Sequence, residues 1–151
     1  MKEAPGLEAF IGKVAELVSA ATPSTMLTPG IHQAYESGVA KLKANSNVQE
    51  IAQAKETSGP NQCRANLFVT NAKAFLQDHA LRDEVFGSSS LIIKCTTDDE
   101  VLELTKSLEG QLTATVLMEP NDDKVFIKKL LSILERKVGR ILFNGYPTGV
   151  E

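Results

Sequence analysis

The chain has 151 residues, of which 42% are hydrophobic and 23% charged, and its 16 Lys and Arg against 19 Asp and Glu give a net charge of −3. This charge disfavours nucleic-acid binding, which needs clustered basic residues. No apolar run approaches the ~18–20 residues that span a bilayer, and the N-terminus lacks the apolar core of a signal peptide. Two cysteines make no disulfide framework, so we expect a cytoplasmic protein without nucleic-acid or membrane partners.

Two helices are predicted at the start of the chain. Apolar residues at helical spacing predict the first from Gly6 to Ala20, and the proline of Thr22-Pro23-Ser24 ends it. Thr28 is suited to be the N-cap of the second helix and Pro29 its first residue. This helix should stop near residues 44–47. Its apolar stripe consists of Ile31, Tyr35, Val39 and Leu42.

The middle of the chain alternates between strands and short connections. Strands are predicted from Val48 to Ala54 and from Ala65 to Thr70, separated by the turn-rich residues 57–61. A short helix follows over 71–76. The segment from Leu81 to Ser90 reads as an ordered connection, and Leu91 to Cys95 as an apolar strand.

The last third carries clear helix signals. Thr97 and Glu100 form a capping box for a helix that Gly110 should close, and a strand is predicted from Leu112 to Leu117. Residues 121–123 (Asn-Asp-Asp) should cap another helix, which Gly139 should end. The apolar residues of that helix include Phe126, Leu130, Leu131 and Leu134.

A final strand over residues 140–144 completes an alternation of strands and helices. Crossovers of this length imply parallel pairing with right-handed connections. The predicted fold is therefore α/β with three layers, a mostly parallel sheet flanked by helices, in a single domain over residues 1–151. The glycine- and proline-bearing end at Glu151 indicates a piece of a longer protein.

Cysteine and histidine are the residue types that most often mark a catalytic site. Cys95 shares a strand face with Leu91 and Ile93, which favours a small buried hydrophobe over a nucleophile. Cys63 is predicted to lie in a polar loop beside Arg64, an environment that would somewhat acidify its thiol. Pairing of either cysteine with a histidine has no supporting local pattern.

His32 and His79 lie near predicted helix ends, where favourable electrostatics explain them better than catalysis does. The spacing of cysteines and histidines does not suit zinc. The acidic residues 98–100 and 122–123 lie where helix caps belong, so capping is favoured over metal binding. No glycine-rich phosphate loop or nucleophile elbow is present.

The segment Asp83-Glu84-Val85-Phe86-Gly87, followed by a strand, resembles the Glu-x-Phe-Gly-Pro stretch of the aldehyde dehydrogenase superfamily. The tail from Gly139 to Glu151, Gly-Arg-Ile-Leu-Phe-Asn-Gly-Tyr-Pro-Thr-Gly-Val-Glu, is similar to a bacterial branch that includes α-ketoglutaric semialdehyde and NADP-dependent aldehyde dehydrogenases. Residues 110–115 (Gly-Gln-Leu-Thr-Ala-Thr) fit the same branch. The resemblance extends over nearly the whole chain from Pro5 and indicates part of the C-terminal catalytic domain.

This resemblance implies an NAD(P)-dependent oxidoreductase that converts an aldehyde to a carboxylate, with α-ketoglutaric semialdehyde as a candidate. It implies that Glu84 accepts hydrogen bonds from the nicotinamide ribose hydroxyls and that Phe86 packs beside the nicotinamide. A charged acceptor and a flat apolar ring suit these roles. Ser88 stands where the family usually has proline, which affects the turn that aims Glu84.

The family's nucleophilic cysteine belongs to a Gly-Gln-x-Cys segment that would precede Pro5, and its main cofactor domain also lies outside the chain. Neither Cys63 nor Cys95 matches that segment, so we expect the chain to be inactive alone and not to bind NAD or NADP tightly. Asn144 and the loop after it would lie near the active site. Mapping substrate contacts onto Tyr146, Pro147 or Thr148 goes beyond the pattern.

Two alternatives remain open: a free-standing α/β binding or interaction module without catalysis, and a fragment whose role is assembly. We expect a homo-oligomer, because the strands at Val48 to Ala54 and Arg140 to Asn144 would offer unpaired edges once separated from neighbouring segments. The sequence does not determine the aldehyde or the choice between NAD and NADP.

Overall fold

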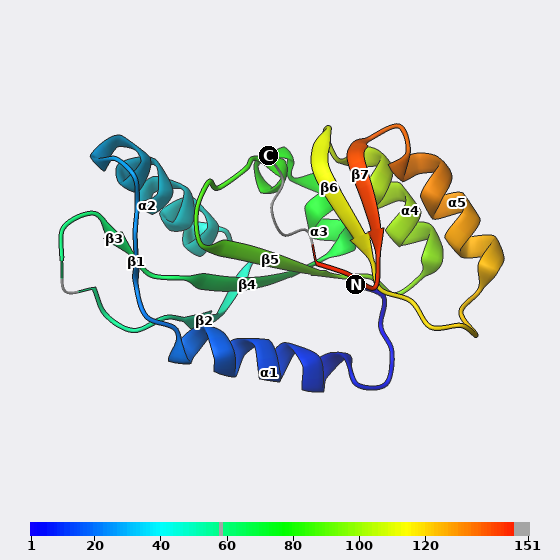
Figure 1. The fold of residues 1–151 in the computed structure, drawn as a ribbon, viewed down its shortest axis with the longest axis horizontal. Helices are drawn as coiled ribbons and strands as arrows, with labels where there is room; N and C mark the ends of the chain where they lie inside the picture. Colours follow the sequence, from blue (N-terminus) through cyan, green and yellow to red (C-terminus); the bar gives the residue numbers. More distant parts are fainter. Residues whose placement is uncertain (58, 147–151) are drawn as a thin grey trace. The chain divides into compact units, whose positions relative to one another are not determined.

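A computed structural model describes residues 1–57 and 59–146 (Figure 1). The chain divides into two compact units, Met1–Thr96 and Thr97–Glu151, and each is described by itself. The expected single domain over residues 1–151 stays a prediction. Within the described ranges, no helix combines the length and apolarity needed to cross a membrane.

The first unit consists of three α-helices, one short 3₁₀ helix and five strands. In chain order these are α1 (Leu7–Ala20), β1 (Ser24–Thr25), α2 (Pro29–Ala44), β2 (Gln49–Gln53), β3 (Gln62–Cys63), β4 (Asn66–Asn71), α3 (Ala72–Gln77), η1 (His79–Arg82) and β5 (Ser89–Lys94). The short strands β1 and β3 pair with each other, and the sequence pattern does not predict them.

The two N-terminal helices begin as their sequence signals predict. Gly6 precedes α1 with a φ of 96°, a left-handed conformation that suits glycine. The Thr28 side chain accepts a hydrogen bond from the Ile31 backbone N–H at 3.2 Å, and Pro29 is the first residue of α2. The predicted starts of both helices are therefore confirmed within one residue.

The sheet of the first unit has the order β2-β4-β5 and is mixed. Strand β4 runs parallel to β5, from Asn66 opposite Ser89 to Asn71 opposite Lys94. Strand β2 runs antiparallel to β4. The connections explain this difference: α3 and η1 form a crossover between β4 and β5, whereas the described residues between β2 and β4 contain no helix.

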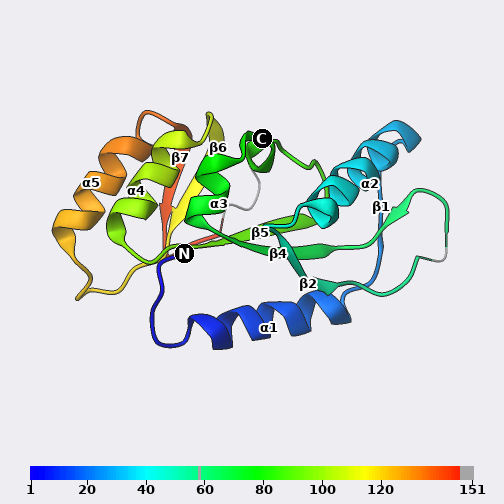
Figure 2. The ribbon, with the colours of Figure 1, turned by 180° about the vertical axis from the view of Figure 1, so that it is seen from behind.

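Helices flank this small sheet on both sides. Figures 1 and 2 show α1 along one face and α2 with α3 over the other. A hydrophobic core cluster joins α2 to the strands and includes Tyr35, Val39, Cys63 and Phe68. Val85, in the segment that leads into β5, also packs against this cluster.

The second unit contains α4 (Asp98–Ser107), β6 (Gln111–Val116), α5 (Lys124–Leu134) and β7 (Val138–Phe143). Strands β6 and β7 are parallel, and both helices lie on the same side of the pair (Figure 2). The α/β class is confirmed. The expected single, mostly parallel sheet is wrong for the described residues, whose strands form three small sheets of both orientations.

The N-terminal caps of the second unit match the sequence, but the C-terminal signals do not. Thr97 and Glu100 form the predicted capping box, and the Asp123 carboxylate accepts from two backbone N–H groups of α5. Gly110 does not close α4, which ends at Ser107; instead Lys137 Nζ donates to the Lys106 carbonyl at 2.7 Å.

Gly139 likewise does not end α5, which stops at Leu134. It lies inside β7, where a Cβ would stand 3.2 Å from the Leu112 carbonyl oxygen. The lack of a side chain at Gly139 therefore allows two strands to approach closely and does not mark a helix end.

Substitution of Thr97 by alanine should destabilise α4 by about 1 kcal/mol, because the Glu100 backbone N–H loses its side-chain acceptor. Amide hydrogen exchange over residues 101–107 measures this directly. The exposed Glu103→Ala on the same helix is the control and should change protection by less than about 0.5 kcal/mol. Equal effects of the two variants would contradict a role for the cap.

Candidate functional site

The segment from Glu84 to Gly87, called the Glu84–Gly87 loop below, connects η1 to β5. Its side chains alternate in direction. Glu84 and Phe86 are exposed, with 65% of Phe86 accessible, whereas Val85 is partly buried against the core cluster. The loop therefore presents a carboxylate and an aromatic ring outward from an apolar anchor.

Val85 reaches the core because α2 carries glycine at the contact. A Cβ on Gly38 would lie 2.9 Å from Val85 Cγ1 and 3.1 Å from Cγ2, closer than carbon atoms normally approach. The valine side chain thus occupies the space that any other residue at position 38 would fill. Gly38 lets the loop pack directly on the helix backbone.

Gly87 meets α2 one turn away, at Tyr35. Its φ is +147°, and a Cβ would stand 2.4 Å from Tyr35 Cδ2 and 3.0 Å from Met26 Cε. Both the backbone conformation and the lack of space require glycine here. The glycine of the Glu-x-Phe-Gly pattern is therefore the point where an aromatic ring lies against the loop backbone.

The surface around the loop is hollowed on two sides. A hollow of about 600 Å³ lies beside the contact between the loop and α2, and its lining includes Lys41 and Glu84. A second hollow, of about 370 Å³, is lined by Glu84 and Phe86 together with the start of β5. Glu84 is exposed, and none of residues 1–57 and 59–146 donates a hydrogen bond to its carboxylate.

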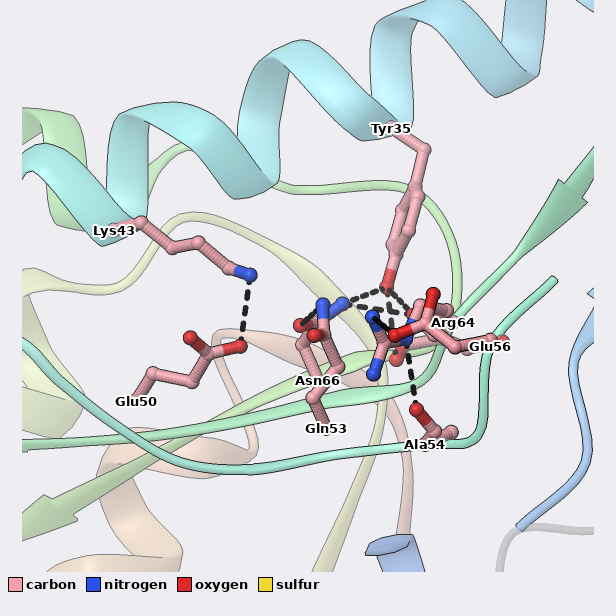
Figure 3. Close-up of polar contacts among 9 residues, drawn as sticks. Tyr35, Lys43, Glu50, Gln53, Ala54, Glu56, Arg64 and Asn66 are labelled. Carbon is pink, nitrogen blue, oxygen red and sulfur yellow. Dashed lines mark hydrogen bonds and ion pairs between the residues drawn. The ribbon is translucent and has the colours of Figure 1, made fainter.

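A polar network surrounds the Tyr35 hydroxyl (Figure 3). The Tyr35 hydroxyl donates to the Arg64 carbonyl at 2.6 Å and lies 3.2 Å from the Ser88 carbonyl. The Asn66 side-chain amide donates to the Tyr35 oxygen at 2.9 Å. Burial raises the pKa of Tyr35 above its usual value, so the hydroxyl stays protonated and able to donate at neutral pH.

This network is connected further to the strands and their connection. Asn66 Oδ1 accepts from Gln53 at 3.0 Å, which ties β4 to β2. Arg64 Nε donates to the Ala54 carbonyl at 2.8 Å, and its guanidinium also pairs with Glu56 at 2.8 Å. Arg64 and Asn66, which contact Tyr35, are therefore held by β2 and by the residues that follow it.

The two cysteines are core residues. Cys95 has only 1% of its surface accessible, as expected of a small buried hydrophobe. Cys63 also has 1% accessible and lies in β3 within the core cluster, so its placement in a polar loop is wrong. Its neighbours in sequence are polar, but the strand turns its side chain toward Tyr35 and Phe68.

The histidines have local partners. His32 Nε2 lies 3.0 Å from the Gln62 carbonyl and 3.8 Å from the Glu36 carboxylate, and His79 Nδ1 lies 3.4 Å from an Arg82 nitrogen. In the described part of the chain, no three histidine, cysteine or acidic residues group as metal ligands would. The acidic residues at 98–100 and Asp123 lie at helix N-termini, as predicted.

Asn144 belongs to the second unit, where it joins the ends of β6 and β7. It has a φ of 47°, and its side-chain amide exchanges two hydrogen bonds with the Met118 backbone, at 2.8 and 3.0 Å. Tyr146 is 82% exposed. Pro147 and Thr148 lie outside the described residues, so a substrate contact there stays untested.

The sequence pattern does not reveal the residues that support the Glu84–Gly87 loop. Tyr35 falls in an apolar stripe, and Gly38 carries no signal of its own. A tyrosine in such a stripe does indicate that its hydroxyl needs a buried partner. That partner, the Ser88 carbonyl, lies 53 residues away and cannot be identified from local spacing.

No protein-family model matches the chain. It is 43% identical over 149 residues to α-ketoglutaric semialdehyde dehydrogenase 2 of Azospirillum brasilense, and 33% identical over 150 residues to α-ketoglutaric semialdehyde dehydrogenase of Acinetobacter baylyi. Each alignment covers 99% of this chain and 28% of the relative. The chain is a partial-length homologue of the aldehyde dehydrogenase superfamily. The resemblance seen in the sequence is confirmed.

Solved aldehyde dehydrogenase structures share the fold. The enzyme of Bacillus cereus matches with a TM-score of 0.76 at 12% identity, over 99% of this chain and 30% of that one. Betaine aldehyde dehydrogenase of Staphylococcus aureus, solved in complex with NAD+, matches with a TM-score of 0.71 at 12% identity, over 95% of this chain and 30% of that one.

The contact between Gly38 and Val85 predicts that substitutions at these two positions have strongly non-additive effects on the free energy of unfolding. Alanine normally stabilises a helix by about 1 kcal/mol relative to glycine, but Gly38→Ala should destabilise by about 1–3 kcal/mol because its Cβ overlaps Val85. In a Val85→Ala background, the same change should become stabilising. Urea denaturation of the four chains gives the coupling energy.

Gly12→Ala in α1 is the matched control, since nothing lies within 4 Å of the added Cβ. It should gain up to about 1 kcal/mol from helix propensity alone. If Gly38→Ala behaves like Gly12→Ala in the otherwise unchanged chain, Val85 does not pack on α2 as described.

Proposed function

We propose that this chain forms part of the catalytic domain of an NAD(P)-dependent aldehyde dehydrogenase that oxidises a semialdehyde such as α-ketoglutaric semialdehyde to a carboxylate. Similarity to two dehydrogenases of that specificity supports the substrate class. The chain spans about 28% of the length of those relatives, so the proposed activity requires segments in addition to residues 1–151.

The observation that carries the proposal is the outward presentation of Glu84 and Phe86 from a loop whose intervening residue is anchored. Val85 packs on Gly38 while its two neighbours face solvent at the edge of a hollow of about 370 Å³. A free carboxylate beside an exposed ring suits a ligand that carries vicinal hydroxyls next to a flat heterocycle. The residues present therefore fit a nicotinamide nucleoside.

In this proposal, Glu84 accepts hydrogen bonds from the nicotinamide ribose hydroxyls, and Phe86 packs beside the nicotinamide ring. Hydrogen bonds to an ionised acceptor are stronger than those between neutral groups, and the aromatic face excludes water from one side of the ring. The bound dinucleotide supplies the hydride acceptor. The two side chains fix its position, and correct positioning is a large part of the rate of such a transfer.

The chain is proposed to be inactive alone. Both thiols are buried, with 1% of each cysteine accessible, and a nucleophile must reach the aldehyde carbon. The reactive cysteine would come from a segment preceding Pro5 in the longer enzyme. Assembly as a homo-oligomer is proposed for that enzyme as well.

In a full-length enzyme that includes residues 1–151, Glu84→Gln should lower kcat/KM for the cofactor by about five- to thirtyfold, because the ionised acceptor is lost while size is kept. Steady-state kinetics at saturating aldehyde measure this. Asp83→Asn removes one negative charge at the adjacent exposed position and should change the value by less than about twofold.

Unchanged kinetics in Glu84→Gln would show that the cofactor contact was assigned to the wrong residue. An equal loss in Asp83→Asn would indicate a general field effect in place of a direct contact. Absence of aldehyde oxidation in any longer protein that contains this chain would favour the alternative, a binding module without catalysis.

A further inference from the structure

The Tyr35 hydroxyl lies between two backbone segments, those that lead into β4 and β5. It contacts the Arg64 carbonyl before β4, the Asn66 side chain at the start of β4, and the Ser88 carbonyl before β5. Only 1% of the Tyr35 surface is accessible. Helix α2 therefore places one buried polar group directly behind the Glu84–Gly87 loop.

The direction of these hydrogen bonds follows from the donors present. Because the Asn66 amide donates to the Tyr35 oxygen, the hydroxyl hydrogen must point elsewhere, toward the two carbonyl groups. The same amide also donates to the Arg64 carbonyl at 2.8 Å, so that oxygen has a second donor. The single hydroxyl hydrogen of Tyr35 is shared unequally, with the shorter bond to the Arg64 carbonyl at 2.6 Å and the longer one to the Ser88 carbonyl at 3.2 Å.

The Ser88 carbonyl is a fixed point of the loop. It accepts from the Asn66 backbone N–H at 2.9 Å, beside the first rung between β4 and β5, and from Tyr35. Gly87 precedes Ser88 and has a φ of +147°, which glycine adopts readily. Because glycine has no side chain, its own backbone dihedral angles are only weakly restricted. Contacts from α2 restrict the loop at two points, Tyr35 against Gly87 and Gly38 against Val85.

We propose that Tyr35 is a positioning residue for the Glu84–Gly87 loop, with its hydroxyl holding the Ser88 carbonyl and its ring holding Gly87, so that Glu84 and Phe86 are aimed at the cofactor. This inference rests on the proposed function for its consequence in catalysis. The ring packs on Gly87 from the helix side, and Val85 on Gly38 provides the anchor on the other side of Phe86. Tyr35 itself touches neither substrate nor cofactor.

The test uses Tyr35→Phe, which keeps the ring against Gly87 and removes only the hydroxyl. Thr70→Val is the matched control. Thr70 is 4% exposed, lies on β4 and donates one side-chain hydrogen bond to the Asn47 carbonyl at 2.8 Å. Both variants lose a buried hydroxyl on the same face of the sheet, but only one of these hydroxyls contacts the loop.

The first measurement is amide hydrogen exchange, by NMR, on the 151-residue chain. The Asn66 and Ser89 amides, bonded to the Ser88 and Gly87 carbonyls, report on the clamp. In Tyr35→Phe they should exchange about tenfold faster than in Thr70→Val after correction for each variant's global stability. Equal exchange in the two variants would overturn the proposal.

The second measurement is the cofactor KM in the full-length enzyme at saturating aldehyde. Tyr35→Phe should raise it about three- to tenfold with kcat changed less than about twofold, and Thr70→Val should change neither. Faster exchange with an unchanged KM would overturn the positioning role, as would a raised KM without faster exchange. Glu84→Gln distinguishes failure of the positioning inference from failure of the proposed function. If Glu84→Gln alters the cofactor KM and Tyr35→Phe does not, only the positioning inference fails. If Glu84→Gln has no effect, the proposed function fails as well.

Discussion

The contact between helix α2 and the Glu84–Gly87 loop is the constraint on which the candidate site depends. It has two points, Gly38 against Val85 and Tyr35 against Gly87, and at each point a glycine on one partner makes room for a side chain on the other. Since the loop contributes no regular backbone ladder of its own, these contacts determine where its exposed side chains stand.

The sheet explains why the contact can form. Strands β4 and β5 are parallel neighbours, and the residues just before each of them, Arg64 and Ser88, present carbonyl oxygens to the same tyrosine. Phe68 on β4 belongs to the same buried cluster as Tyr35. The core that stabilises the first unit thus also orients the loop.

Ser88 illustrates how a departure from the family pattern can be accommodated. The Glu-x-Phe-Gly-Pro stretch has proline at this position, and proline restricts the backbone by its ring. The Ser88 carbonyl accepts from the Asn66 backbone N–H and from the Tyr35 hydroxyl. Proline lacks only the backbone N–H, so both hydrogen bonds to this carbonyl are compatible with either residue.

Local signals in the sequence predict much of the fold and less of the site. Helix starts at Thr28, Thr97 and Asp123 can be predicted because a cap acts over three residues. Gly139 misleads because a glycine can also serve the close approach of two strands, and Gly110 misleads because α4 already ends at Ser107. Strand pairing and the surroundings of Cys63 depend on contacts between segments that are distant in sequence. Local residue spacing does not predict such contacts. Glu84 and Phe86 can be predicted only through a family pattern. Tyr35 and Gly38, which support their loop from α2, cannot be predicted from the sequence pattern.

Nuclear Overhauser effects on the folded 151-residue chain measure the α2–loop contact most directly. Packing of Tyr35 on Gly87 and of Val85 on Gly38 predicts strong cross-peaks between the Tyr35 ring protons and the Gly87 Hα protons, and between the Val85 methyl groups and the Gly38 Hα protons. Cross-peaks between Val39 and Phe68 would show that the core is formed. A spectrum with those core cross-peaks but neither loop contact would contradict the positioning of Glu84 and Phe86 by helix α2.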